Sequence, residues 1–306
     1  MLEKVRNARA IVDKEIEGFV RTRDLGLLFL EPKSGEFAAC YREWIQASRL
    51  NRFSGLSEKE FPHASYVHGT SQAFDFFYRE HFHKRFRFMK GEFAYHKIFS
   101  RNTLQSAPLE EDVLRQGDAL IVSLPFSDSG GLPEGLSQTL DECARLQIPV
   151  LIDAAYIGIS TGLEFDFSHP AIHTVATSLS KTFYGAAYAR VGVRFQRKHI
   201  DDPVDFFNDV GMFSRVGWHL GIQMMQKFSA DYIAEKYRAT QIAICQELGV
   251  EPSSCVIFGI ARSDDGALQV DLRLPAELGG PGGGVRGRTS DQPRRLGKWC
   301  VEPRDP

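Results

Sequence analysis

Short apolar runs that alternate with helix-like segments are the feature that most constrains the fold of this chain. Between "ALIVSL" (119–124) and "PVLID" (149–153) lies an amphipathic segment with Leu136, Leu140 and Cys143 on one face. A strand, a helix and a strand at this spacing form a βαβ unit, and similar runs repeat along the chain. The runs are "RFRFM" (85–89), "ALIVSL", "PVLID", "HTVATSL" (173–179) and "RVGVRF" (190–195). The sequence therefore predicts an α/β fold with a mostly parallel sheet covered by helices.

The remainder of the chain divides into segments of different character. Residues 1–50 have helical spacing, 51–65 are predicted as a loop, and a helix is expected to begin at Thr70 or Ser71. Residues 51–202 are predicted to form a large domain. Residues 203–278 combine long helices with strand candidates at 255–261 and 267–274, which predicts a smaller α+β domain. The Gly-, Pro- and Arg-rich segment 279–306 is predicted to be a disordered tail.

Composition excludes several classes of protein. A net charge of −2 gives no basic field for nucleic acid or an anionic membrane. The five cysteines are scattered without a CxxC pair, which is typical of reduced thiols. The chain begins with a charged segment and contains no apolar run of about 20 residues, the length that spans a bilayer. We therefore expect a cytoplasmic globular protein that binds neither nucleic acid nor membrane.

Polar side chains follow the predicted strands at the point where each strand ends. Segments of this kind are "KGEFAYH" (90–96), "PFSDSGG" (125–131), "DAAY" (153–156) and "SLSK" (178–181), and the polar segment "HGTS" (68–71) stands at the start of the expected helix. Because the ligands of open α/β sheets bind beyond the carboxyl ends of the strands, these segments predict one binding cleft. Lys181 is notable among them, since lysine is rarely buried without a partner.

In this order along residues 60–195, these motifs resemble the fold-type I pyridoxal-phosphate enzymes, the aspartate aminotransferase-like superfamily. The resemblance implies that Lys181 binds the cofactor pyridoxal 5'-phosphate as a Schiff base and then serves as the base at the substrate α-carbon. It implies that Asp153 keeps the pyridine nitrogen protonated and that Tyr156 donates to the phenolic oxygen. The alternatives from the residues alone are a surface lysine, a helix-capping aspartate and a tyrosine of the core.

The resemblance also assigns residues to the phosphate and the ring. Gly69, Thr70 and Ser71 at a helix start, Ser178 and Ser180 beside the lysine, and Arg190 would bind the phosphate. Simple helix capping is the alternative for Thr70 and Ser71, and Arg190 lies nine residues after the lysine where eight are expected. Phe93 would stack on the pyridine ring, with Tyr95 as its competitor.

Two features depart from the family pattern. The Asn-Pro-Thr-Gly turn of the family is Ser127-Asp128-Ser129-Gly130 here, so that Ser127 or Asp128 stands where an asparagine donates to the phenolic oxygen. The arginine that binds the substrate carboxylate is assigned to Arg273, in a late strand, with Arg262 as second choice.

Taken together, the resemblance predicts an aminotransferase that moves an amino group between an amino acid and a 2-oxo acid and acts as a homodimer. A lyase, decarboxylase or cyclase that uses the same cofactor is one alternative, and a non-catalytic relative is another. Outside these motifs, the histidines of "HFH" (His81 and His83) are predicted to lie on a helix surface rather than to bind a metal, because side chains at i and i+2 face apart. The "GGPGGG" run lacks the Lys-Ser/Thr of a P-loop.

Overall fold

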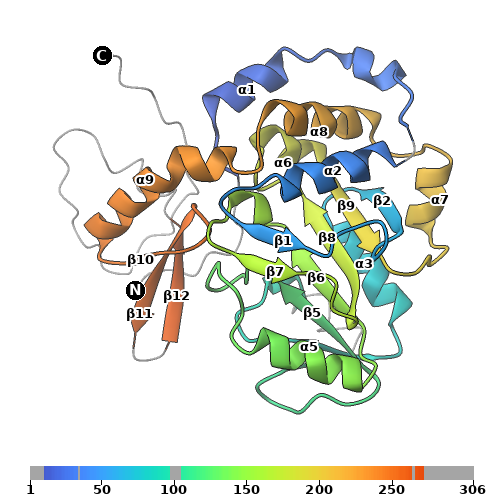
Figure 1. Cartoon of the computed structure of the whole chain (residues 1–306), viewed down its shortest axis with the longest axis vertical. Helices are drawn as coiled ribbons and strands as arrows, with labels where there is room; N and C mark the ends of the chain where they lie inside the picture. The colour runs from blue at the N-terminus through green and yellow to red at the C-terminus, as the bar shows by residue number, and fades with distance from the viewer. Residues whose placement is uncertain (1–9, 34, 97–104, 264–265, 272–306) are drawn as a thin grey trace, which may run out of the picture.

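A seven-stranded sheet forms the centre of the protein (Figure 1). The computed structural model describes residues 10–33, 35–96, 105–263 and 266–271. In spatial order the strands are β2 (His63–Val67), β9 (Gly192–Gln196), β8 (Ile172–Ser178), β6 (Val150–Ala154), β5 (Asp118–Ser123), β3 (Arg85–Phe88) and β4 (Ser106–Pro108). Only β9 runs antiparallel to its neighbours in this sheet, while the pairs from β8 to β4 are parallel. The predicted α/β fold with a mostly parallel sheet is confirmed.

Alternating side chains of the central strands face two separate cores, as the pleat of a strand requires. Leu120 and Val122 of β5 belong to the larger core, to which α2 (Glu36–Gln46), α5 (Leu136–Arg145) and α8 (Arg215–Lys227) contribute. Ala119 and Ile121 face the opposite side, where α3 (Thr70–Glu80) covers the sheet. The sheet is therefore apolar on both faces, which explains why its strands are continuous apolar runs in the sequence.

The predicted helix between β5 and β6 is present as α5. Its apolar face, Leu136, Leu140 and Cys143, is buried as the spacing indicated. The amino-terminal segment is helical as well, since it contains α1 (Lys14–Arg21), the short 3-10 helix η1 (Leu25–Phe29) and α2.

The prediction of a loop over residues 51–65 is wrong in two places. Arg52–Ser54 forms β1, which pairs in parallel with β7 (Glu164–Asp166), and His63–Val67 forms the edge strand β2. Both are short strands in a segment rich in charge, so that no apolar alternation marks them. Their pairing partners lie about a hundred residues further along the chain.

The carboxyl-terminal part consists of helices followed by a small sheet. Helices α7 (Pro203–Asp209), α8 and α9 (Tyr232–Leu248) precede an antiparallel sheet of β10 (Glu251–Pro252), β11 (Phe258–Ser263) and β12 (Gly266–Asp271). Figure 1 shows α8 beside α2, whereas α9 and the small sheet lie at one side of the molecule. The division at residues 51, 203 and 279 stays a prediction, and the tail lies outside the described residues. None of the helices in the described ranges combines the length and the apolarity that a membrane crossing needs.

Candidate active site

A cavity of about 190 Å³ lies beyond the carboxyl ends of β5, β6 and β8, next to the first turn of α3. Most of the residues predicted from strand ends meet there, although they are spread over more than a hundred positions of the sequence. The lining residues are Thr70, Ser71, Phe93, Tyr95, Ser123, Pro125, Ser127, Asp153, Ala155, Tyr156, Ser180, Lys181 and Arg190. Parallel strands bring these segments together because their carboxyl ends share one edge of the sheet.

Lys181 lies in the turn that follows β8 and is partly buried. Its Nζ lies 5.7 Å from the ring centroid of Tyr156. Ser178 holds this turn, since its hydroxyl donates to the Val191 carbonyl at 3.0 Å and accepts from the Ser180 amide at 3.1 Å. Ser180 therefore lines the cavity beside Lys181, while Ser178 lies behind it as an anchor of the turn.

A polar corner forms where the first turn of α3 meets Arg190. The Arg190 guanidinium donates to the Ser71 hydroxyl at 2.8 Å. Gly69 precedes the helix at φ +77°, and a Cβ at this position would lie only 2.6 Å from Arg190 Nη2. Only glycine permits this approach. The corner thus combines a helix amino terminus, the hydroxyls of Thr70 and Ser71, and a guanidinium, which are groups suited to a phosphate.

Asp153, near the end of β6, is buried at the base of the cavity with 6% of its surface exposed. Its carboxylate accepts a hydrogen bond from the Ala155 amide at 3.1 Å. Burial, and next the charge of Glu92, raise the pKa of Asp153 to about 7, although the Ala155 amide and Lys181 act in the opposite direction. A carboxylate in this condition would be stabilised by a cationic group placed in the cavity.

Glu92 was not predicted as a site residue, yet it is buried next to this site, with 4% of its surface exposed. Its Oε1 accepts from the Phe93 amide at 2.8 Å, from the Ser127 hydroxyl at 3.0 Å and from the Ser123 hydroxyl. Its Oε2 accepts from the Ser123 amide at 2.8 Å. Burial raises the pKa of Glu92 despite these donors. A single Glu in a loop is usually solvent-exposed, so that no sequence signal marked it.

The hydroxyl hydrogen of Ser127 is donated to a neighbouring side chain. Its two acceptors are Glu92 Oε1 and the Ser123 hydroxyl, each at 3.0 Å, and a serine has one hydrogen to donate. The Ser123 hydroxyl in turn donates to Glu92. Both serines therefore use their hydroxyl hydrogens within the group of Ser123, Ser127 and Glu92.

Comparison with known proteins gives matches at the level of structure. The sequence matches no protein-family model, and no curated protein sequence matches it. An aspartate aminotransferase from Thermus thermophilus, solved with maleate, is 14% identical, with a TM-score of 0.64 over 86% of this chain and 78% of its own. An aromatic aminotransferase from Pyrococcus horikoshii is 11% identical, with a TM-score of 0.60 over 88% and 90%. A PLP-bound C-S lyase from Staphylococcus hominis, in complex with L-cycloserine, is 9% identical, with a TM-score of 0.66 over 90% and 85%.

The chain has the fold of the fold-type I pyridoxal-phosphate enzymes. TM-scores of 0.60–0.66 establish this fold, and at identities of 9–14% the likeness shows the fold alone. Within the fold, the cavity occupies the position expected for a ligand of an open α/β sheet.

Two aromatic side chains compete for the stacking position within this fold. Phe93 and Tyr95 both line the cavity, with ring centroids 6.1 Å apart and planes at 13°. The Tyr95 hydroxyl donates to Asp75 on α3, so that its ring is fixed at the outer end. Both residues stay candidates for the aromatic group that covers a ring in the cavity.

The remaining predicted residues lie elsewhere. Asp128 does not line the cavity, and its side chain packs so closely on Gly91 that a Cβ there would lie 2.7 Å from Oδ2. Of the two residues proposed for the asparagine position, Ser127 alone borders the cavity. Arg273 lies outside the described residues, and so does the side chain of Arg262.

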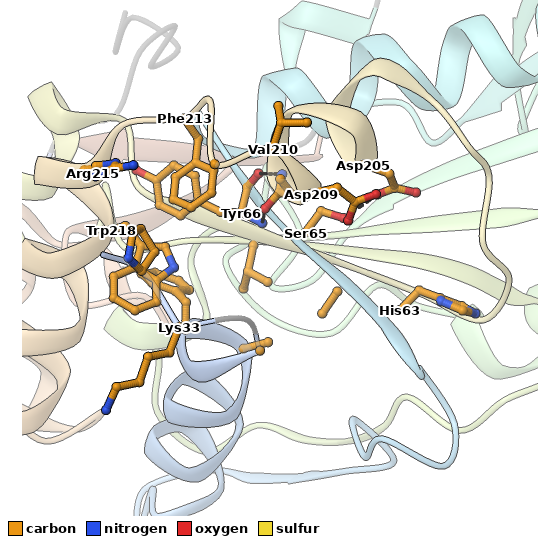
Figure 2. A pocket seen from close by; sticks show the side chains of 18 of the residues that line it. Lys33, His63, Ser65, Tyr66, Asp205, Asp209, Val210, Phe213, Arg215 and Trp218 are labelled. Atoms are coloured by element: carbon orange, nitrogen blue, oxygen red, sulfur yellow. Dashed lines mark hydrogen bonds between the residues drawn. The ribbon is translucent and has the colours of Figure 1, made fainter. Parts of the chain in front are cut away.

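A larger hollow of about 560 Å³ shares none of the predicted residues (Figure 2). It lies along the edge strand β2, among side chains of α2, α7 and α8. Figure 2 shows Trp218 and Phe213 toward one end of it and Asp205 toward the other. Asp205 accepts from the Ser65 hydroxyl at 2.5 Å and from Arg194 at 2.8 Å. Asp205 shares Arg194 with Asp202. The residues predicted to carry the chemistry line the smaller cavity.

Proposed function

We propose that this chain is a pyridoxal-phosphate-dependent enzyme, and that it acts as an aminotransferase between an amino acid and a 2-oxo acid. One observation carries the proposal. Lys181 and Asp153 follow neighbouring parallel strands and line one cavity together with the polar corner at the start of α3. An amine, a buried acid and a phosphate-binding corner around one cavity are the three groups that this cofactor requires.

The residues present fit the cofactor. Arg190, Ser71 and the first amides of α3 supply donors for the phosphate dianion. Asp153 supplies a buried carboxylate for the protonated ring nitrogen, and the charge of Glu92 adds to the attraction for that proton. Phe93 or Tyr95 supplies a ring to stack on. Ser178 stabilises the turn that carries Lys181.

When bound, the cofactor supplies an aldehyde that condenses with amines and a ring that accepts electrons from the substrate α-carbon. Lys181 would hold it through Nζ, and the same nitrogen, once released by substrate, would carry the proton at the α-carbon. Asp153 would retain the proton of the ring nitrogen throughout. Tyr156, whose ring lies against Lys181, would donate its hydroxyl hydrogen at the phenolic oxygen.

The decisive experiment is the absorbance spectrum of the purified full-length protein after incubation with pyridoxal phosphate. We expect a visible band in the wild type that borohydride reduction fixes covalently to the peptide containing Lys181. Lys181→Ala should lose both the band and the labelled peptide, whereas Lys198→Ala, an exposed lysine beyond β9, should retain them. A wild type that binds no cofactor, or a label on another lysine, would overturn the proposal.

A lyase that uses the same cofactor is the second candidate, and Ser127 is the observation that favours it. The family pattern implies an asparagine donor at this position, whereas the Ser127 hydrogen is directed to Glu92 or Ser123. An acceptor here would alter the electronics of the cofactor and so the bond that breaks. A panel of amino acids separates the candidates, because an aminotransferase converts the bound cofactor to its amine form and a lyase releases a 2-oxo acid without doing so.

Three further proposals come with this function. We expect a homodimer, a cytoplasmic location, and small-molecule partners only, namely an amino acid and a 2-oxo acid. Sedimentation of the full chain tests the first. A non-catalytic relative, the remaining alternative, is distinguished by the absence of any spectral response to amino acids.

A further inference from the structure

Three side chains that could bind a metal converge at the end of α3 and the start of β8, opposite to the ends that carry the cavity. They are Glu80, the last residue of α3, His81, its C-cap residue, and His173 in β8. One ligand atom from each lies within 4.8 Å of the other two. The prediction that His81 lies on a helix surface is wrong, since only 7% of its surface is exposed. His83, the other histidine of that motif, is exposed.

Each of the two histidines has a nitrogen close to a different oxygen of the Glu80 carboxylate, at a separation near that between two ligands of one zinc ion. His173 Nε2 lies 3.4 Å from Glu80 Oε1, and His81 Nε2 lies 3.6 Å from Glu80 Oε2. Zinc ligands at about 2.0–2.2 Å in a tetrahedron are roughly 3.3–3.5 Å apart. Two imidazole nitrogens and a carboxylate oxygen are also a ligand set that zinc accepts, with a water molecule in the fourth position.

Two of the ligand atoms are buried without a hydrogen bond. His81 Nε2 and Glu80 Oε2 have no hydrogen-bond partner within the described residues. Buried polar atoms are normally paired, and a cation between these two would satisfy both. His81 is more than nine-tenths buried, and its unpaired nitrogen is directed at the carboxylate.

A contact at Nδ1 orients the ring of His173. Its Nδ1 lies 2.9 Å from the Thr174 hydroxyl, which leaves Nε2 toward Glu80. Ligand histidines in metal sites are commonly held by such a contact at the other ring nitrogen.

Two of the four cations near the cluster form ion pairs with acids. Lys84, Arg194, Arg197 and Lys198 are the nearby cations, and Asp202 is a nearby acid. Arg194 donates to Asp202 and Asp205, and Arg197 donates to Glu60. These pairs reduce the repulsion that the arginines would exert on a metal ion. The side chains of Glu80 and His173 are 22% and 18% exposed, which leaves a route from solvent.

We propose that Glu80, His81 and His173 form a zinc site that fastens the carboxyl end of α3 to the start of β8. The opposite end of α3 carries Thr70 and Ser71, and the opposite end of β8 leads to Lys181. Zinc bound here would restrain both elements that carry the cavity without entering the cavity itself. The proposal concerns only this cluster and does not depend on the cofactor.

The test uses the full chain after treatment with a chelator. Titration with zinc chloride in a calorimeter should show one equivalent bound to the wild type, and cobalt chloride should give the intense visible bands of tetrahedral coordination. His81→Gln and His173→Gln should each weaken zinc binding at least tenfold and abolish the cobalt bands. His83→Gln, the exposed histidine two residues away, should retain both, and so should Lys181→Ala.

Thermal unfolding is a second test in case the substitution of a buried histidine prevents folding. Zinc should raise the midpoint temperature of unfolding of the wild type and of His83→Gln. It should leave the midpoint of Glu80→Gln unchanged, because this variant lacks a ligand. Glu80 is partly exposed, so this variant is expected to fold. Absence of stoichiometric binding by the wild type would overturn the proposal. Equal loss of binding in His83→Gln and His81→Gln would overturn it as well.

Discussion

Two buried aspartates on neighbouring strands of the sheet, Asp118 and Asp153, have opposite electrostatic surroundings. Asp118, at the start of β5, accepts from Arg85 at 2.7 Å and from Arg87 at 2.9 Å. Burial acts to raise its pKa, but the hydrogen bonds from Arg85, the Arg115 amide and Arg87 outweigh burial and hold the pKa below its usual value. Asp153, at the other end of β6, has Glu92 nearby, and its pKa rises to about 7.

The comparison distinguishes a structural acid from a functional one. A buried carboxylate that is paired with arginines has its charge compensated within the fold, and removal of one partner is strongly destabilising. A buried carboxylate beside a second acid is destabilising in the empty protein, and a cationic ligand relieves it. The buried acid at the amino end of β5 is therefore compensated by arginines, whereas the buried acid at the carboxyl end of β6 lies beside a second acid.

The largest effect on stability is expected from Asp118→Asn. This change leaves Arg87, which has no exposed surface, without its acid, and breaking a buried pair costs about 3–5 kcal/mol. Denaturant unfolding measures the free energy. Glu142→Gln, which removes an exposed pair with Arg145, serves as control and should change little. Equal effects of the two changes would contradict the structural role of Asp118.

Asp153→Asn should reduce turnover without reducing stability. The empty variant should be at least as stable as the wild type at pH 8, because an uncompensated buried charge is removed. Turnover should fall about a hundredfold or more, which corresponds to about 2.7 kcal/mol of barrier. Steady-state kinetics and unfolding of the same preparation test both parts. Loss of stability with unchanged turnover would show that Asp153 is structural.

The two aspartates should give opposite dependences of stability on pH. The folded pKa of Asp153 lies above its unfolded value of about 3.9, so that its contribution to stability is present below pH 4 and is lost as the pH rises to about 7. The slope is at most about 1.4 kcal/mol per pH unit. Asp118, with a lowered pKa, loses its contribution as the pH falls below about 4. Between pH 4 and 8, the free energy of unfolding of the cofactor-free protein should therefore depend less steeply on pH in Asp153→Asn than in the wild type.

Glu92→Gln is expected to have the smallest of these effects. Removal of this charge should lower the pKa of Asp153 below about 7. The measurement is the pH dependence of unfolding, or the carboxyl signal of Asp153 in an NMR titration. Glu134→Gln, at an exposed position, should leave the titration unchanged. An unaltered pKa of Asp153 in Glu92→Gln would show that Glu92 does not raise it.

Local sequence pattern predicted the central strands because they are buried on both faces. The apolar runs at 85–89, 119–124, 149–153, 173–179 and 190–195 all coincide with strands, within two residues at each end. The edge strand β2 and the pair β1–β7 were missed, since an exposed strand carries charged side chains and is defined by its partner. That β9 runs antiparallel was also decided by pairing alone.

The sequence by itself determined the buried central strands, their order along the chain and the polar residues at their ends, because each of these depends on neighbours within a few positions. Only the tertiary structure decided that Glu92 lies beside Asp153 and that His81 faces His173. These contacts join segments far apart in the chain, and the burial that shifts a pKa or aligns ligand atoms exists only after the helices cover the sheet. The types of side chain are therefore local properties of this chain, whereas their charges and their partners are properties of the fold.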